Sequence, residues 1–352
     1  MRVLFVIHEL ALNGAVTALL AQVRALTAAG TQVTVLAPAV TGRAAALRED
    51  FLAAGAAVVA RTTAAEHDVA VGCTVFAAEA LATLVGHLPL VWWIHEGEGG
   101  VEYLVARPAM RQLLGRVDRL VFPGRGTVER VWAGLLGGLP PGRADVIPAL
   151  VAPPVAGPAA AKAAGRVRVL CVGSIYPRKR QGDLIAAVAA LGPAAPVECV
   201  LAGERVQLDP AAESLIAANA DRFLLPGGLA PAAVQALYRS ADIFALPSAE
   251  ESMPIAPLEA AMFGVPVVLT DLDCYAGVWR HGVNALLHPV ADVELLAWSL
   301  RMLIESPGLR ARLAAAGRMV AERFGPARTT ALFAAVLGEV VAGRQVPRAG
   351  AG

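Results

Sequence analysis

The sequence predicts an α/β protein built from two doubly wound, Rossmann-like domains that face a central cleft. A chain of 352 residues is longer than one hydrophobic core ordinarily accommodates, and its length suits two domains. Short apolar runs alternate with longer Ala/Leu-rich segments, and a nearly uncharged Pro/Ala/Gly-rich stretch at 148–165 separates two such series. We therefore expect the following division of the chain: an N-terminal domain over 1–150, a linker over 151–165, a second domain over 166–325, and a terminal helix over 326–345 that packs back on the first domain.

The first half predicts a parallel sheet covered by helices on both faces. Helices are expected at Ala15–Ala29 and Arg43–Ala54, each closed by a glycine (Gly30, Gly55), and at Ala77–Gly86. Unbroken apolar strands between helices are typical of parallel sheets. The strands expected are Val3–Ile7, Gln32–Ala37, Ala57–Ala60, Val69–Gly72, Leu90–Ile94, Leu120–Pro123 and Asp145–Ile147.

The second half repeats this alternation after the linker, which again favours a doubly wound sheet. The strands expected are Val167–Val172, Val197–Ala202, Phe223–Leu225, Ile243–Leu246 and Val267–Leu269. The helices expected are Asp183–Leu191, Ala211–Ala218, Pro231–Arg239 and Pro257–Phe263, with further helices filling the C-terminal end.

Composition argues against a membrane span, a secreted protein and a nucleic-acid partner. The most apolar window, Ala80–Ile94, is interrupted by His87 and Pro89 and is shorter than the roughly 20 residues that cross a bilayer. The N-terminal apolar run is too short for a secretion signal, and the four scattered cysteines suit buried reduced thiols. The net charge of +1 offers no field for nucleic acid. We expect a cytoplasmic protein.

One cluster of basic residues has two interpretations, one of which involves a membrane. Six arginines lie between Arg107 and Arg130, and a solvated helix face is the favoured interpretation. A patch that faces the acceptor or a lipid is the alternative, so peripheral contact with the inner face of a membrane stays open. The oligomeric state is not readable from the sequence.

The glycine loops argue against a dinucleotide-dependent dehydrogenase, which would share this outline. No GxGxxG follows any expected strand. The loop after the first strand runs from His8 to Ala15, and Gly124-Arg125-Gly126 lacks the third glycine.

The segment from Leu246 to Val268 carries the clearest chemistry. A strand ends at Leu246, and a helix begins near Pro257, because proline suits a first helical turn. Free N–H groups at that helix end, with the helix dipole, make a site for a diphosphate. Glu259 is expected in the first turn, where a carboxylate can accept two ribose hydroxyls. The structural alternative is that Glu259 only complements the dipole and Glu251 is solvated.

These residues resemble a known family. Glu251 and Glu259, eight positions apart and followed by Ala-Ala-Met-x-Gly-x-Pro-Val-Val, resemble the E-x7-E signature of the retaining family-four glycosyltransferases, which have the GT-B fold. The resemblance implies that Glu259 binds the donor ribose and that Glu251 faces the donor sugar near the reacting centre. It also implies that the sugar and diphosphate are held by the backbone of four residues: Ser252, Met253, Pro254 and Ile255.

A second segment agrees with that resemblance. Residues Val172 to Lys179 resemble the family's G-R-L-x-x-x-K segment, whose cations grip the diphosphate, with Gly173 at its start. Lys179 matches the family lysine and is one of only two lysines in the chain, the other being Lys162. Ser174 stands where the family has arginine. Arg178 either supplies the missing charge or forms an exposed turn.

Weaker matches extend the resemblance. Gly228 falls in the loop that contacts the nucleotide base, and His95, at the end of a strand, would touch the transferred sugar unless it is a structural histidine. Asn13 and Gly14 match the small-residue loop that approaches the diphosphate or acceptor, although Asn13 replaces a common glycine. The domain junction at 147–152 departs from the family's usual hinge.

Together these observations predict a retaining, hexosyltransferase-like enzyme that uses a UDP-, GDP- or ADP-sugar as its donor substrate. Glu251, His95 and Lys179 are the expected catalytic residues, and no metal or further cofactor is required, because protein cations stabilise the leaving group. The acceptor is a glycan, lipid or small molecule. The alternatives are a non-catalytic sugar-nucleotide-binding GT-B protein and a GT-B sugar-nucleotide epimerase.

Overall fold

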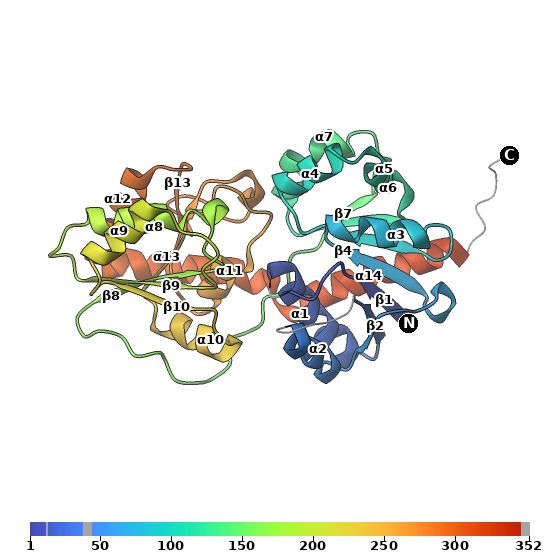
Figure 1. Ribbon diagram of the computed structural model, residues 1–352, viewed down its shortest axis with the longest axis horizontal. Coiled ribbons are helices and arrows are strands. Elements are labelled where there is room, and N and C mark those ends of the chain that lie inside the picture. Colours follow the sequence, from blue (N-terminus) through green and yellow to red (C-terminus); the bar gives the residue numbers. More distant parts are fainter. Residues whose placement is uncertain (12, 38–43, 346–352) are drawn as a thin grey trace. The chain divides into compact units, whose positions relative to one another are not determined.

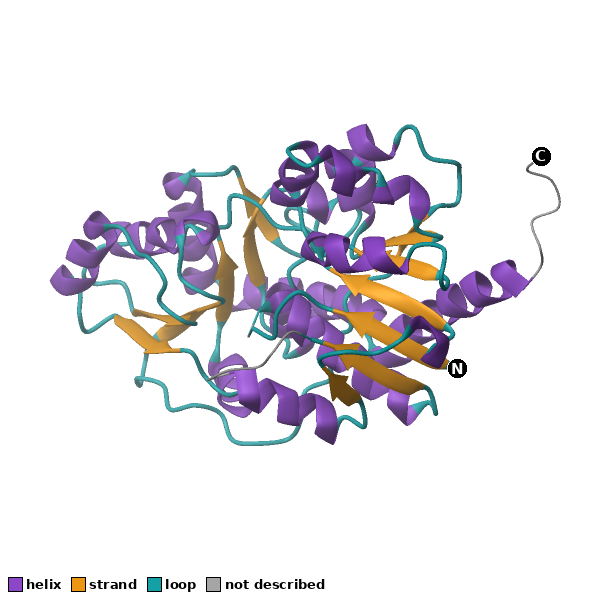
Figure 2. Cartoon of the chain, turned by 45° about the vertical axis from the view of Figure 1, so that its right-hand side comes forward, coloured by secondary structure: helices purple, strands orange, loops and turns teal. Residues whose placement is uncertain are grey.

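A computed structural model describes residues 1–11, 13–37 and 44–345 (Figure 1). The chain divides into two compact units. Unit 1 contains Met1–Leu150 and the segment that starts at Phe324, and unit 2 is Val151–Arg323. In each unit, strands form one sheet and helices lie against it (Figure 2).

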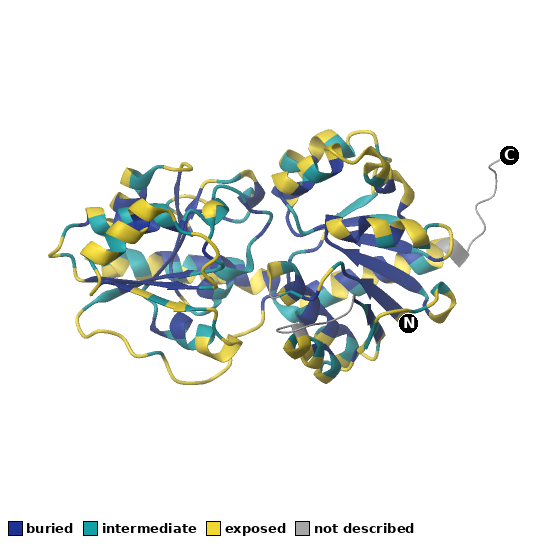
Figure 3. Cartoon of the chain, viewed as in Figure 1, coloured by how far each residue is buried: buried dark blue, intermediate teal, exposed yellow. Residues whose placement is uncertain are grey.

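Unit 1 contains a seven-stranded, all-parallel sheet in the order β3-β2-β1-β4-β5-β6-β7. Its central strands are buried because helices cover both faces (Figure 3). The strand order reverses between β1 and β4, the place where doubly wound sheets open a crevice at their carboxyl edge. The strands are β1 (Arg2–Val6), β2 (Gln32–Leu36), β3 (Ala57–Val59), β4 (Val69–Cys73), β5 (Leu90–Trp93), β6 (Arg119–Phe122) and β7 (Ala144–Val146).

The last helix of the chain belongs to unit 1. This helix, α14 (Pro326–Gln345), packs on α1, β4 and β5, so the end of the sequence completes the cover of the first sheet. The other α-helices of the unit are α1 (Gly14–Ala28), α2 (Ala44–Ala53), α3 (Ala78–Leu84), α4 (Glu98–Val105), α5 (Pro108–Arg111), α6 (Leu113–Arg116) and α7 (Ala133–Leu136). Shorter turns are η1 (Ala64–Glu66), η2 (Val75–Ala77) and the π-turn η3 (Thr127–Val131).

Unit 2 contains a six-stranded parallel sheet in the order β10-β9-β8-β11-β12-β13, with its own reversal between β8 and β11. The strands are β8 (Val167–Val172), β9 (Val197–Ala202), β10 (Phe223–Gly227), β11 (Ile243–Leu246), β12 (Val267–Thr270) and β13 (Leu286–His288). The helices are α8 (Gln181–Ala190), α9 (Pro210–Ala218), α10 (Pro231–Ser240), α11 (Ile255–Met262), α12 (Val293–Glu305) and α13 (Pro307–Ala321). The 3-10 turns are η4 (Pro177–Lys179), η5 (Asp273–Tyr275) and η6 (Glu322–Phe324).

The segment 151–165 has no regular secondary structure, but hydrogen bonds attach it to unit 2. Ala160 N donates to Ala236 O at 2.9 Å, and the Arg239 guanidinium donates to the carbonyls of Val155 and Pro158. A composition typical of a flexible linker therefore belongs to a segment that runs along helix α10.

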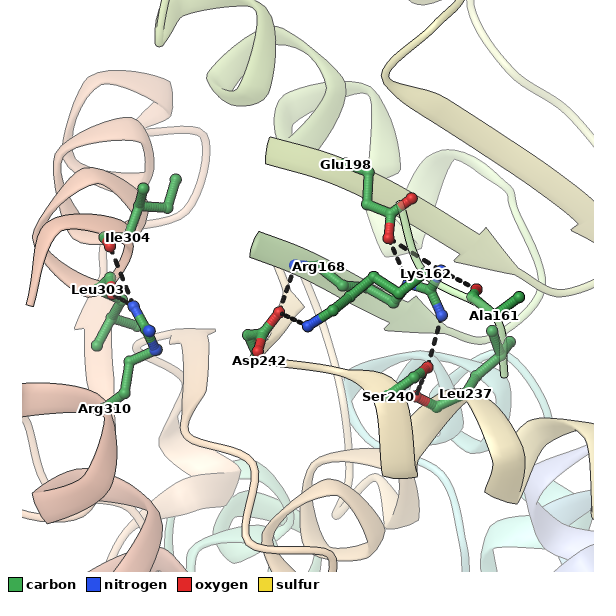
Figure 4. Close-up of polar contacts among 10 residues, drawn as sticks. All are labelled: Ala161, Lys162, Arg168, Glu198, Leu237, Ser240, Asp242, Leu303, Ile304 and Arg310. Atoms are coloured by element: carbon green, nitrogen blue, oxygen red, sulfur yellow. Dashed lines mark hydrogen bonds and ion pairs between the residues drawn. The ribbon is translucent and has the colours of Figure 1, made fainter. Parts of the chain in front are cut away.

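Beside Ala161 and Lys162 of that segment lies a buried arginine, Arg168 at the amino end of β8 (Figure 4). Its Nε donates to Glu198 Oε1 at 2.9 Å, Nη1 to Ser240 Oγ at 2.5 Å and Nη2 to Ala161 O. Beside it, Asp242 accepts from Arg168 N and from Lys162 Nζ, both at 2.7 Å. The buried charges are fully partnered, as burial of ions requires.

The structure corrects several element boundaries. Helix α11 begins at Ile255 rather than near Pro257, so Glu259 is its fifth residue and lies in the second turn, not the first. Strand β13 was not predicted, because three residues after a loop carry too little pattern. Helices α4, α5 and α6 were not predicted either. Arg43, the expected start of α2, lies outside the described residues.

Two further findings bear on the class of protein. Each of the four cysteines is buried and free. Among the described residues, no helix is both long enough and apolar enough to span a membrane.

Candidate functional site

The carboxyl edge of unit 2's sheet is formed by glycines that let strand ends approach one another. A Cβ on Gly203, just past β9, would lie 2.0 Å from the carbonyl oxygen of Gly173, so only glycine fits there. Gly203 N donates to Gly227 O at 3.0 Å, and exposed Gly228 follows directly after β10. Sequence reasoning selected Gly173 and Gly228 but missed Gly203, whose requirement appears only when β8 and β9 are paired.

Glu251 is the centre of the polar cluster at this edge. Its side chain is 6% exposed and accepts from Lys179 Nζ at 2.5 Å and from Ser248 Oγ at 2.7 Å. Arg178 Nη1 lies 3.4 Å from its other carboxylate oxygen. The structural alternative, in which Glu251 is solvated, is therefore wrong, and Ser248 is a partner that the sequence did not reveal.

Arg178 points toward the loop that carries Glu251. Its Nε donates to the Tyr176 hydroxyl at 2.8 Å, and Nη1 donates to the Glu250 carbonyl. Ala249 N in turn donates to the Arg178 carbonyl at 2.8 Å. Arg178 is therefore no freely exposed turn residue, and its guanidinium lies with Lys179 beside Glu251.

The electrostatics of the cluster favour an anion. Burial alone would raise the pKa of Glu251, but Lys179 and Arg178 together hold that pKa below its ordinary value. Two cations thus act on the one buried carboxylate of the cluster, Glu251, while the Glu250 carboxylate also acts on Arg178. The side chains of Lys179 and Arg178 keep 15% and 34% exposure, so a ligand can still reach them.

Ser174 contributes no charge to this edge. Its carbonyl accepts from Gln181 Nε2 at 2.9 Å, which ties the loop after β8 to the start of α8. The side chain is partly buried. The position at which the family has an arginine is thus occupied by a neutral serine. Arg178, four positions further on, carries a guanidinium in the same loop.

Helix α11 begins beside the cluster. Pro254 is its N-cap and offers no side-chain hydrogen bond to the first turn, so the positive end of the helix keeps its backbone donors. The loop before it contains Ser252, partly buried, and Met253, buried. Ile255 is the first helical residue.

Glu259 is oriented by a residue that sequence reasoning missed. The Tyr238 hydroxyl, from α10, donates to Glu259 Oε2 at 2.9 Å. Burial raises the pKa of Glu259, and the hydrogen bond from Tyr238 opposes that rise. Tyr238 is the only tyrosine in its helix, but its partner lies 21 positions away, a distance that no local pattern reports.

In unit 1, Asn13 and Gly14 begin a helix. Asn13 is the N-cap of α1, its Oδ1 accepting from Val16 N at 2.9 Å, and Gly14 is the first helical residue. The small-residue loop was expected to offer its backbone N–H groups to a ligand. Asn13, which replaces a common glycine, already accepts a hydrogen bond from one of them, Val16 N. A small pocket at this edge is lined by Ile7, His8, Glu9, Asn13, Ala15, Val16, Leu19, Cys73 and Thr74.

His95 lies two residues beyond the end of β5. Its Nε2 is buried and has no hydrogen-bond partner among the described residues, and its ring is 4.3 Å from the ring of Trp93. Burial lowers the pKa of His95 to about 3, so the imidazole is neutral at physiological pH. Its buried Nε2 is the polar atom that a ligand hydroxyl would satisfy.

Three of the six arginines of the 107–130 cluster have identified partners. Arg119 pairs with Glu339 at 2.9 Å, Arg125 pairs with Glu129 at 3.1 Å, and Arg107 stacks 4.0 Å from the centre of the Tyr103 ring. In the described part of the chain, no group of three or more His, Cys, Asp or Glu side chains is arranged to hold a metal ion.

Both halves of the sequence match glycosyltransferase families. Residues 158–320 match the model of "Glycosyl transferases group 1", and residues 1–134 match that of "Glycosyl-transferase family 4". A D-inositol 3-phosphate glycosyltransferase of Salinispora arenicola is 34% identical over 189 residues, which are 49% of this chain and 41% of that protein. A phosphatidyl-myo-inositol mannosyltransferase of Mycobacterium leprae is 38% identical over 104 residues, 29% of this chain and 27% of that protein. The matched region thus spans less than half of these curated relatives.

Solved structures agree on the fold. Anabaena HepE in complex with UDP-glucose superposes with a TM-score of 0.79 at 20% identity, covering 96% of this chain and all of that one. Sucrose-phosphate synthase from Thermosynechococcus elongatus gives 0.78 at 16% identity, covering 97% and 100%. The fold is GT-B, and the two family matches support a glycosyltransferase that is similar to family 4 in its N-terminal half and to group 1 in its C-terminal half.

Proposed function

We propose that this protein transfers a sugar from a nucleoside-diphosphate sugar to an acceptor hydroxyl with retention of configuration. The observation that carries the proposal is the cluster of Lys179 and Arg178 on Glu251, beside the uncapped start of α11. A diphosphate leaving group develops negative charge as the glycosidic bond breaks. Fixed cations and helix N–H donors stabilise that charge without reorganising.

Glu251 has two tasks in this proposal. It holds both cations in place before the donor arrives, because its oxygens are 2.5 Å from Lys179 Nζ and 3.4 Å from Arg178 Nη1. When the diphosphate binds, the cations are shared with phosphate oxygens. Glu251 then remains as an ionised acceptor for hydroxyls of the donor sugar.

Glu259 binds the ribose. Its carboxylate is fixed by Tyr238, and a carboxylate held in one rotamer can accept two vicinal hydroxyls. Because burial raises its pKa, hydroxyl donors that replace lost water favour the ionised form. Gly228 leaves room for the nucleotide beside the end of β10, because no atom lies within 4 Å of the place its Cβ would take.

The acceptor hydroxyl attacks on the face from which the diphosphate leaves, and a diphosphate oxygen takes its proton. In this scheme the neutral imidazole of His95 contributes a hydrogen bond to a sugar hydroxyl rather than a charge. UDP-glucose is the first donor to test, because the neighbour HepE holds it. Inositol and its phosphate are the first acceptors, because the curated relatives are named for them.

The test is turnover of radiolabelled UDP-, GDP- and ADP-sugars with and without these acceptors. Glu259→Ala and Lys179→Ala should abolish transfer while circular dichroism shows a folded chain. Lys162→Ala is the matched control, since it removes the chain's only other lysine, which pairs with Asp242 instead. Near-normal rates in Glu259→Ala or Lys179→Ala would contradict the site.

Two alternatives have distinct results in the same experiment. A non-catalytic binding protein, motivated by Ser174 in place of arginine, would bind a donor tightly and release no product. An epimerase would convert the donor to a second sugar nucleotide without an acceptor.

A further inference from the structure

One partly buried carboxylate outside the site described above joins two loops of unit 1. Glu96 follows β5, and its Oε2 accepts from its neighbour's backbone, His95 N, at 3.1 Å. The same oxygen accepts from Val75 N at 3.0 Å, in the loop after the adjacent strand β4. A single oxygen atom thus links the carboxyl ends of two neighbouring strands.

The loop on the β4 side is strained. Thr74 has φ +74° and ψ 160°, a backbone conformation that is essentially restricted to glycine. Several bonds hold Thr74 there: its N–H donates to Trp93 O at 2.9 Å, and its carbonyl accepts from Trp92 Nε1 at 2.8 Å. The bond from Val75 N to Glu96 fixes the next peptide.

The strained residue presents its hydroxyl to the first strand's loop. Thr74 Oγ1 lies 3.2 Å from His8 Nδ1, within hydrogen-bond distance. Thr74 and His8 both line the pocket at this edge, whereas Glu96 does not. Glu96 therefore acts on the pocket wall from behind, through Val75 and Thr74.

The surrounding residues make room for this carboxylate. A Cβ on Gly100 would lie 2.5 Å from Glu96 Cβ and 2.9 Å from the Trp132 ring, so a side chain at position 100 would displace Glu96. Trp132 Nε1 donates to the Glu96 carbonyl at 3.0 Å. Burial raises the pKa of Glu96 to about 7, and hydrogen bonds from the backbone of Val75, Glu96 and His95 partly offset that rise.

We infer that Glu96 is a positioning residue: its carboxylate holds the strained Thr74 loop against the loop of His95 and thereby sets His8, in the pocket wall, and His95 in fixed relation at the carboxyl edge of the sheet. Its relevance to transfer rests on the proposed function. Its effect on the pocket does not depend on the proposed function, because the His8 side chain can be observed by NMR in the ligand-free protein.

The test compares Glu96→Ala with Glu96→Gln. The glutamine carbonyl can still accept from Val75 N and His95 N, so this variant keeps both hydrogen bonds without the charge. Alanine removes both hydrogen bonds. In the ligand-free protein, the imidazole NMR resonances of His8 should move in Glu96→Ala and stay in Glu96→Gln. Glu98→Ala, an exposed acid two residues further on, is the matched control and should move neither histidine.

Kinetics supply the second measurement. We expect Glu96→Ala to lower kcat for transfer from UDP-glucose by about 10²-fold, the scale of a misplacement of about 1 Å, with the donor KM little changed. Glu96→Gln should restore most of that kcat. If the wild-type protein transfers no sugar, the proposed function fails. The His8 resonances still show whether Glu96 positions His8.

A third variant covers the case in which Glu96→Ala does not fold. Thr74→Val keeps the shape and removes the hydroxyl, so it should move the His8 resonances and leave those of His95 in place. The inference is overturned if His8 is unmoved in a folded Glu96→Ala or in Thr74→Val, or if Glu96→Gln loses as much kcat as Glu96→Ala.

Discussion

The two ends of unit 2's sheet each hold a buried glutamate paired with a cation, but they differ in how completely the cation is satisfied. At the amino end, Arg168 is 1% exposed and donates to Glu198, Ser240 and the Ala161 carbonyl (Figure 4). At the carboxyl end, Lys179 keeps solvent access and meets Glu251 beside a helix start that lacks a side-chain cap. A closed set of partners indicates a structural role, and an open one indicates a binding site.

The largest expected effect concerns the closed end. Arg168→Met leaves Glu198 buried without its partner, which should cost about 3–5 kcal/mol of unfolding free energy. The double variant Arg168→Met/Glu198→Leu should recover most of it, because replacing both members of a buried pair is often nearly neutral. Urea denaturation measures both. A single variant as stable as the wild type would remove the structural role of this pair.

The open end should respond in binding rather than in stability. Arg178→Met removes a charged donor, and we expect UDP-glucose affinity to fall by roughly 10–100-fold, the equivalent of about 1.5–3 kcal/mol. Arg180→Met is the matched control, because Arg180 pairs with Asp183 at 2.7 Å. Isothermal titration calorimetry compares them. Equal losses in the two variants would indicate a diffuse basic patch instead of a defined site.

Acid should weaken the open end in a defined direction. Lys179 and Arg178, against the effect of burial, lower the folded-state pKa of Glu251, so its contribution to stability is present above the unfolded pKa and is lost as pH falls through the folded value. The stability difference between wild type and Glu251→Gln should therefore shrink as pH is lowered below about 4.3, the ordinary glutamate pKa. A difference that grows on acidification would contradict the pairing.

The smallest effect is expected at Tyr238. Tyr238→Phe removes the single hydrogen bond that orients Glu259, which is worth about 1 kcal/mol. The donor KM should rise by roughly five-fold with kcat little changed, as steady-state kinetics can show. An unchanged KM would mean that Glu259 is held by its packing alone.

Sequence patterns predicted the strands well because an apolar run bounded by turn residues is a local signal. Val167–Val172 and Val197–Ala202 begin and end at the predicted residues in β8 and β9. The start of α11 was placed too late, because Pro257 fits any position of a first turn and the residues before it carry no cap signal.

The partners of the site residues were harder to predict than the residues themselves. Lys179 and Glu251 could be selected by resemblance, but their contact depends on how the loops after β8 and β11 meet across the sheet. Gly203 and Thr74 are set by close approach and backbone strain, and neither property has a sequence pattern. Long-range contacts of this kind appear only in the folded chain.

The most direct test of the central claim is the affinity for UDP of the chain's two lysine variants. Lys179→Ala should weaken UDP binding by at least ten-fold, which is about 1.4 kcal/mol or more of binding free energy. The reason is that the solvent-accessible Lys179 ammonium at the carboxyl end of the sheet is available to the diphosphate. Lys162→Ala, which disturbs only the closed end, should bind UDP as the wild type does. Equal affinities in Lys179→Ala and wild type, measured by calorimetry on folded protein, would contradict the account.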